Sequence, residues 1–246
     1  MFLIEIYFSR VYNASLLFHK PRFLYDWATN TVPDFVSLSM FALASIYLHN
    51  KNEMNSTTCS EAFNVSSDDW SHYGSNWARL ASQKVLAQAD TPSMHTAQAC
   101  QILVLYWFAS DQTDRANFHA TVAYHTCRLL GYHRNHYPDD IDCISAELRR
   151  RCLWSCWMTQ CVSQGNAQFS GSSWNEVVGV LLPSDDLAFT DGRPSTAGYL
   201  DENGDVQVHG EFTDQSSRAS HNAELAKLIG LWYVSNFATG TKCMLS

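Results

Sequence analysis

Apolar residues recur every three or four positions along several long segments of this chain, and this spacing constrains its fold more than any other feature. Residues three and four apart share one face of an α-helix, so each such segment predicts a helix with one buried face. The helices expected in this way cover about 1–10, 35–49, 67–84, 92–110, 118–130, 145–164 and 225–237. Alternation of apolar and polar residues, which would indicate strands, nowhere extends over a useful length. The sequence therefore predicts an all-α fold, a multi-helix bundle.

Local signals predict where some helices end and which faces they bury. Thr91 before Pro92 is expected to cap one helix and Ser145 another, because short polar side chains accept hydrogen bonds from the first turn. Gly131 suits the left-handed position that closes a helix. The apolar stripes place Phe118, Leu129, Leu228 and Trp232 on inner faces.

Two stretches without helical spacing are expected to be surface loops. Residues 50–66 are polar and rich in Asn, Ser and Thr, and residues from about 183 to 222 are acidic and contain several glycines. The chain has 246 residues, of which 46% are hydrophobic, so it can build one sizeable core. We expect a single domain over residues 1–246.

The charge of the chain argues against direct contact with nucleic acid. The net charge is -8, and the 16 Lys and Arg residues are scattered apart from the run Arg149–Arg151. Nonspecific binding to DNA depends on many basic groups that displace counterions from the phosphate backbone. We expect no direct binding of nucleic acid.

Cysteine usage and hydropathy indicate a reducing compartment away from membranes. Most of the eight cysteines lie in helix-like segments, where a free thiol behaves as a small apolar side chain. The longest apolar stretch, 99–109, is far shorter than the roughly 20 residues that span a bilayer. The residues Cys243-Met244-Leu245-Ser246 match a prenylation box, but no polybasic run precedes them, so we expect a coincidence.

Four stretches of the chain form a pattern when they are read together. The first is 6–23, the second joins 98–107 to 123–134, the third is 147–157, and the fourth is the loop 182–186. In order and spacing they resemble the fungal-specific transcription factor domain, the middle homology region of six-cysteine zinc-cluster regulators. The positions that match its structural motifs are His19, Pro21, Phe23, Gly131, His133, Arg134, Arg149, Arg150, Arg151, Trp154, Pro183 and Asp185.

The resemblance implies a helical regulatory domain of a transcription regulator, in the nucleus or in both nucleus and cytoplasm. It implies pathway-specific control of a metabolic gene set, such as one for secondary metabolites. The family's DNA-binding module is a zinc cluster with a Cys-x2-Cys-x6-Cys repeat, and no Cys-x2-Cys occurs in this chain. We expect a short or truncated relative that holds no zinc or other cofactor and acts through other regulators or a DNA-binding partner.

The run Arg149–Arg151 also has a structural interpretation. Three successive helical residues point in three directions, so at most two of them face one partner. We expect these arginines to pair with acids such as Glu147 or the acidic loop, or to donate to loop carbonyls.

No catalytic or metal site is expected. The chain contains no nucleophile elbow, P-loop or dinucleotide fingerprint. Cys152, Cys156 and Cys161 have the wrong spacing for a zinc cluster and share a helix. The nearest other set of metal-ligating residues consists of His125, His133, His136, Asp139, Asp140 and Asp142, and it lacks the fixed helical spacing of a metal site.

The aromatic residues leave an alternative function open. Most of the tryptophans on the helix faces, which are Trp70, Trp77, Trp107, Trp154, Trp157 and Trp232, are expected in the core. An aromatic bundle can also hold a small-molecule effector, or serve as a binding protein or enzyme in a biosynthetic pathway. Titratable groups that converge in a closed cavity would indicate an enzyme, whereas a lining of Trp, Phe and Leu would indicate an effector site.

Overall fold

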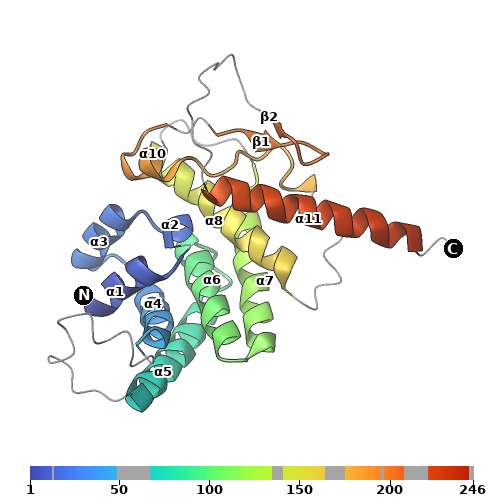
Figure 1. The fold of residues 1–246 in the computed structure, drawn as a ribbon. Helices are drawn as coiled ribbons and strands as arrows, with labels where there is room; N and C mark the ends of the chain where they lie inside the picture. Colours follow the sequence, from blue (N-terminus) through green and yellow to red (C-terminus); the bar gives the residue numbers. More distant parts are fainter. Residues whose placement is uncertain are drawn as a thin grey trace. The chain divides into compact units, whose positions relative to one another are not determined.

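Helices make up most of this computed structural model, which describes residues 1–12, 14–48, 67–134, 141–163, 175–194, 197–207 and 221–243. The strands in these residues form one two-stranded ribbon (Figure 1). The expected all-α fold is confirmed. The expected polar loop at 50–66 and the last three residues of the prenylation box lie outside the described residues.

The chain packs into two compact units, one formed by residues 1–15 and 20–126 and the other by residues 16–19 and 127–246. The single domain expected over residues 1–246 stays a prediction, because compactness alone does not show that a unit is an independent domain. The first unit contains α1 (Phe2–Arg10), the start of α2 (Ala14–Leu17), α3 (Lys20–Ala28), α4 (Asp34–Ile46), α5 (Ser67–Leu86), α6 (Met94–Ala109) and most of α7 (Thr113–Leu129).

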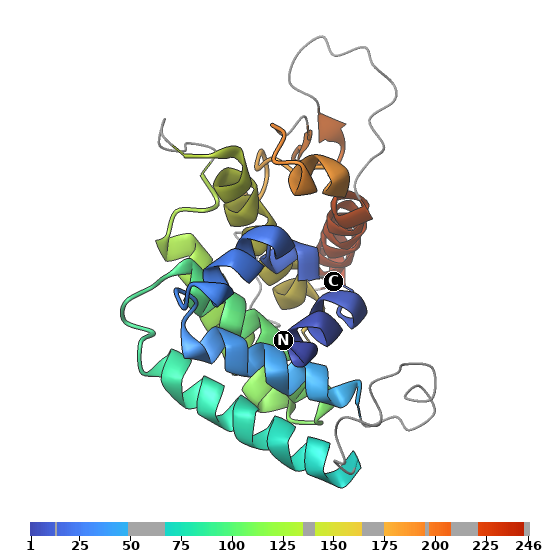
Figure 2. The same cartoon turned by 90° about the vertical axis from the view of Figure 1, so that its left-hand side faces the viewer.

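Helix α4 is the central helix of the first unit, where it packs against α1, α5 and α6. Val36, Met40 and Ala44 are fully buried, as expected for a helix that others enclose. Helices α4 and α5 lie side by side in both views (Figures 1 and 2). Gly74 permits this close approach, because a Cβ atom at that position would collide with the side chain of Ser45.

Helix α7 buries a different face from the one expected. Phe118 is 56% exposed and Leu129 is 74% exposed, so the prediction that they point inward is wrong. The residues that are fully buried on this helix are instead small, namely Ala116, Ala120, Ala123 and Cys127. They recur at spacings of three and four and allow neighbouring backbone to approach closely. The buried face of α7 is therefore not the one that carries Phe118 and Leu129.

The second unit is built around α8 (Cys143–Val162). This helix is buried on every side from Arg150 to Met158, and it packs against α11 (His221–Cys243). The unit also contains α10 (Asp186–Thr190) and an antiparallel ribbon of β1 (Tyr199–Leu200) and β2 (Val206–Gln207). Tyr199 lies opposite Gln207 in this ribbon, and Leu200 lies opposite Val206.

The acidic segment is more ordered than expected. Asp185 caps α10 by accepting hydrogen bonds from the backbone N–H groups of Leu187 at 2.9 Å and Ala188 at 3.2 Å. Asp201 accepts bonds from the backbone N–H groups of Asn203 and Asp205, both at 2.9 Å, and so shapes the turn between β1 and β2. The prediction of an irregular loop is wrong where these acids bind the backbone. Residues 208–220 of the segment lie outside the described residues.

Two helices begin at positions other than those expected. Helix α6 follows Ser93, whose Oγ accepts from the backbone N–H of Thr96 at 3.1 Å. Helix α8 follows Asp142, whose carboxylate accepts from the backbone N–H of Ser145 at 2.9 Å. The predicted caps Thr91 and Ser145 are wrong, because the capping side chain must reach an N–H group two or three residues ahead. Gly131 has a φ of +74°, as predicted.

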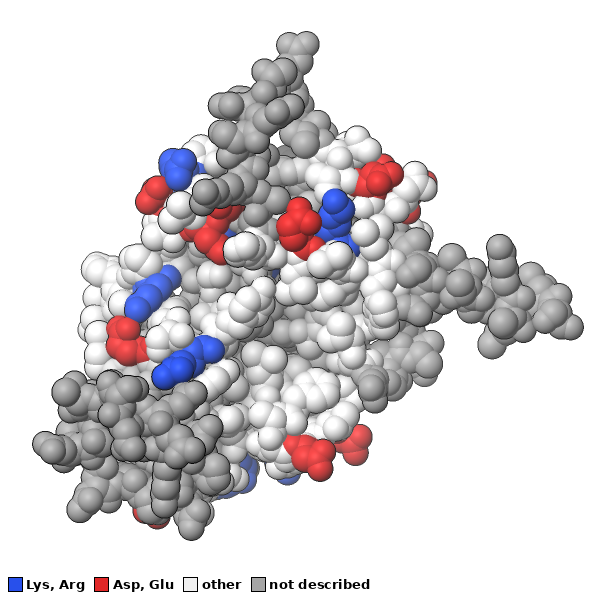
Figure 3. Space-filling model, viewed as in Figure 1, with Lys and Arg blue, Asp and Glu red and all other residues white. Residues whose placement is uncertain are grey.

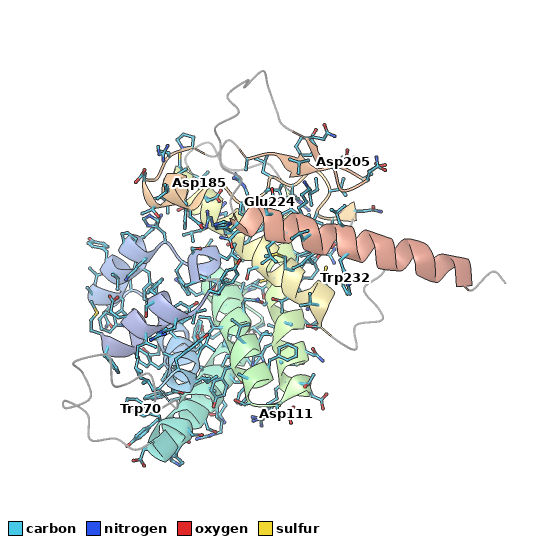
Figure 4. The ribbon with its side chains drawn as sticks, viewed as in Figure 1. Trp70, Asp111, Asp185, Asp205, Glu224 and Trp232 are labelled. Atoms are coloured by element: carbon cyan, nitrogen blue, oxygen red, sulfur yellow. The ribbon has the colours of Figure 1, made fainter. Side chains whose placement is uncertain are left out.

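Helix α11 also presents a different face from the one expected. Asn222 and Ala226 are buried, whereas Leu228 and Trp232 are exposed (Figure 4). Leu228 and Trp232 therefore do not lie on the buried face of α11 that the sequence predicted for them.

None of the helices in the described part of the chain is long and apolar enough to cross a membrane.

Replacing Asp142 with Ala should lower the free energy of unfolding by about 1 kcal/mol, because α8 loses its cap. Urea-induced unfolding monitored by circular dichroism would measure this change. Asp142→Asn is the matched control and should stay close to the wild type, since Asn also caps helices. If both variants lost the same free energy of unfolding, the carboxylate of Asp142 would stabilise the protein by some means other than capping α8.

Candidate functional site

Arg150 and Arg151 of α8 belong to an ionic cluster formed with Glu147, Ser184 and Asp186, which is buried except for the half-exposed Asp186. Glu147 accepts hydrogen bonds from Arg150 Nη1 at 2.6 Å and from Arg151 Nε at 2.8 Å. Arg151 also donates from Nη1 to Asp186 Oδ1 at 2.6 Å and from Nη2 to the carbonyl oxygen of Ser184 at 2.7 Å. The predicted pairing with Glu147, the acidic segment and a loop carbonyl is confirmed for Arg150 and Arg151, whereas Arg149 lies over the ring of Tyr132.

The ionic cluster balances charges that would be costly to bury singly. The side chains of Arg151 and Glu147 are 0% and 4% exposed, so little water solvates either charge. Two arginines face two carboxylates, and Glu147 Oε1 also accepts the backbone N–H of Ser184 at 2.7 Å. A buried ion pair is tolerated when most of its hydrogen-bonding groups are satisfied in this way. Arg150 Nε is the exception in the cluster's ion pairs, since it is buried without a hydrogen-bond partner among the described residues.

Phe189 of α10 connects the cluster to another motif stretch. The guanidinium carbon of Arg151 lies 4.2 Å from the centre of the Phe189 ring, and the His19 ring centre lies 5.1 Å from it. His19 Nε2 is also 3.1 Å from the carbonyl oxygen of Thr190. Residues from the first, third and fourth motif stretches therefore meet around α10.

The remaining motif positions contact other parts of the fold. Arg149 lies over the ring of Tyr132, 5.8 Å from its centre, next to the turn made by Gly131. Trp154 donates from Nε1 to the carbonyl oxygen of Leu181 at 2.8 Å. Burial, followed by the positive charges of Arg134 and Arg128, lowers the pKa of His133. In the first unit, Phe23 is buried against Phe8, and Pro21 is exposed. In the second unit, Arg134 is exposed and Pro183 is buried.

Sequence reasoning missed a cluster of three buried thiols, which we call the thiol cluster. Cys127 Sγ of α7 lies 3.8 Å from both Cys152 Sγ and Cys156 Sγ of α8. Hydrogen bonding to these two thiols, together with burial, raises the pKa of Cys127 well above its usual value. The spacing of Cys152 and Cys156, one helical turn apart, was a signal in the sequence. No signal in the sequence indicated that Cys127 joins them, because its position depends on which face of α7 is buried.

An apolar cavity of about 340 Å³ lies in the first unit, near Trp70 (Figure 4). This volume falls at the lower end of the roughly 300–1,000 Å³ that is typical of small-molecule sites. Its lining comes from the start of α1, from α4 and from α5, and consists of Met1, Phe2, Leu3, Phe41, Trp70, Tyr73 and Trp77.

Replacing Glu147 with Gln should lower the free energy of unfolding by about 3–5 kcal/mol, because two buried arginines lose the carboxylate that they share. Thermal and urea unfolding would measure the loss. The matched control is Asp34→Asn, which removes a carboxylate from an exposed ion pair of the same 2.8 Å length with Lys84. That change should cost less than about 1 kcal/mol. Similar losses in both variants would contradict a special role for the ionic cluster.

Known proteins were compared with the whole chain. The family model of the fungal specific transcription factor domain matches residues 4–163. An uncharacterised transcriptional regulatory protein of Schizosaccharomyces pombe is 23% identical over 247 residues, which cover 94% of this chain and 24% of that protein. A Zn(2)-C6 fungal-type transcription factor of Fusarium oxysporum f. sp. lycopersici is 22% identical over 243 residues, which cover 94% of this chain and 25% of that protein.

The chain thus spans about a quarter of the length of these two relatives. No solved structure matches it significantly. The family model matches well over half of the chain, and its range includes the ionic residues of α8 as well as His19. This chain belongs to the family of the fungal-specific transcription factor domain.

Proposed function

We propose that this chain is the regulatory domain of a transcription regulator that controls a particular pathway, such as a metabolic or secondary-metabolite gene set. The family match over residues 4–163 carries the proposal, and both relatives are named as transcription regulators. In this proposal the domain works in the nucleus through contacts with other regulators. A DNA-binding partner, and not this domain, reads the promoter.

The use of the basic residues supports a role in protein contacts. Arg150 and Arg151 are buried against Glu147. Four further basic residues form ion pairs with acids, namely Lys20, Lys84, Arg128 and Arg193. Figure 3 shows basic and acidic residues interspersed on a mostly uncharged face. A phosphate backbone is bound by several basic groups gathered together, and the described residues on the face in Figure 3 do not offer such a group.

The apolar cavity supports regulation by a small effector. Among the described residues that line it there is no Asp, Glu, His, Lys or Cys, and Tyr73 is the one titratable side chain. Aromatic and aliphatic side chains instead favour an uncharged apolar molecule. The proposed function is therefore regulatory and not enzymatic.

Fusion of the chain to a heterologous DNA-binding domain should change transcription from a reporter gene that carries the matching operator. The chain without the fusion should leave the electrophoretic mobility of promoter DNA unchanged, because its basic residues are paired or scattered. The destabilised Glu147→Gln fusion should lose the effect, whereas the Asp34→Asn fusion should keep it. A folded and expressed fusion that gives the same output as the DNA-binding domain alone would contradict the proposal.

Binding of the apolar dye Nile red should report on the cavity. The substitution Tyr73→Asp places a charge in the apolar lining and should weaken dye binding by about tenfold or more. The same substitution at Tyr25, which is exposed and outside the lining, is the matched control and should change little. Dye fluorescence titrations would give both affinities. Equal dye affinity in the two variants would show that Nile red does not bind in the apolar cavity.

A further inference from the structure

The thiol cluster joins two helices that are separated in the sequence. Cys127 lies near the end of α7, and Cys152 and Cys156 lie one turn apart on α8. All three sulfur atoms lie within 4.8 Å of one another and all three residues are fully buried. Free cysteines are common in protein cores, but they need not converge on one point. The convergence of three buried sulfurs on one point is therefore a specific feature of this fold.

The separations of the sulfur atoms suit a single central atom bound to all three. Sulfurs bound to one atom at about 2.3 Å lie about 3.8 Å apart at tetrahedral angles. A pyramidal trivalent centre has smaller bond angles and would draw the sulfurs somewhat closer together. Two of the three sulfur–sulfur distances are 3.8 Å, and the third is no more than 4.8 Å. Thiolate ligands select soft, thiophilic atoms over the hard cations that prefer oxygen. The geometry thus accommodates a soft atom with only small movements of the side chains.

Charge then distinguishes among the soft atoms. With three thiolates, a monovalent ion leaves a net charge of -2, a divalent ion leaves -1, and a trivalent atom leaves a neutral complex. A buried net charge is costly without a partner of opposite sign. The arginines of α8 are engaged elsewhere, since Arg150 and Arg151 bind Glu147 and Arg149 lies over Tyr132. A neutral complex is therefore the one that this buried position favours.

We propose that Cys127, Cys152 and Cys156 form a binding site for a trivalent thiophilic metalloid of the arsenic(III) class. Arsenous acid, As(OH)3, reacts with three thiols to form three As–S bonds. Each broken As–O bond releases a hydroxide that leaves with one thiol proton as water. The reaction thus yields three waters, and arsenic stays trivalent, so neither an oxidant nor a reductant is needed.

The bound atom would connect the end of α7 to the middle of α8, where Cys152 directly follows Arg151 of the ionic cluster. Because the thiols are fully buried, entry of the metalloid requires a transient opening of this part of the fold. Binding should accordingly be slow and should stabilise the folded state. The site does not depend on the proposed regulatory function, and either proposal can fail without the other.

The test is the reaction of the reduced full-length chain with equimolar sodium arsenite. Native mass spectrometry should show one added arsenic and the loss of three protons. Titration of thiols after denaturation in acid should show three fewer reactive groups. The unfolding temperature of the wild-type chain should rise with arsenite. Absence of the complex after prolonged incubation, or a complex that uses fewer than three thiols, would overturn the proposal.

Matched variants locate the site. Cys127→Ala, Cys152→Ala and Cys156→Ala should each lose the three-thiol complex, whereas Cys100→Ala and Cys161→Ala, which remove buried cysteines outside the cluster, should retain it. Circular dichroism identifies the variants that remain folded. If a variant fails to fold, the thiol count and the thermal shift of the wild-type chain still test the proposal. Loss of the complex in both control variants would overturn the assignment, as would zinc(II) alone binding the wild type more tightly than arsenite.

Discussion

The buried charge of Arg151 is the constraint on which the second unit depends. A guanidinium without water must have its charge balanced and its donors occupied, and no single neighbour can do both. Glu147 is supplied by the same helix, one turn away, but Asp186 and the carbonyl of Ser184 come from a distant segment. The segment after α8 therefore has to fold back as a short helix, and Phe189 then packs beside His19.

The same use of charge connects the fold to the proposed function. Arginines that face inward hold the domain together, and they are unavailable to a phosphate backbone. In this member of the fungal-specific transcription factor family, Arg150 and Arg151 therefore belong to the interior of the described fold.

Small residues occupy several of the buried helix positions in this fold. Alanines are fully buried on α7, and Gly74 permits the close approach of α5 to α4. The same periodicity continues to Cys127 in the second unit, where its sulfur meets those of α8. Close packing of this kind places chemically distinctive groups together where a looser fold would keep them apart.

The sequence by itself determined that the chain is helical, where most helices lie, that Gly131 closes one of them, and that the arginines of α8 pair with acids. These features depend on local spacing and on charge, which act within a few residues. Only the tertiary structure decided the buried faces of α7 and α11, the folding of part of the acidic segment, and the meeting of Cys127 with Cys152 and Cys156. Those outcomes depend on how closely helices approach and on hydrogen bonds between distant residues, which the order of apolar residues along the chain does not specify.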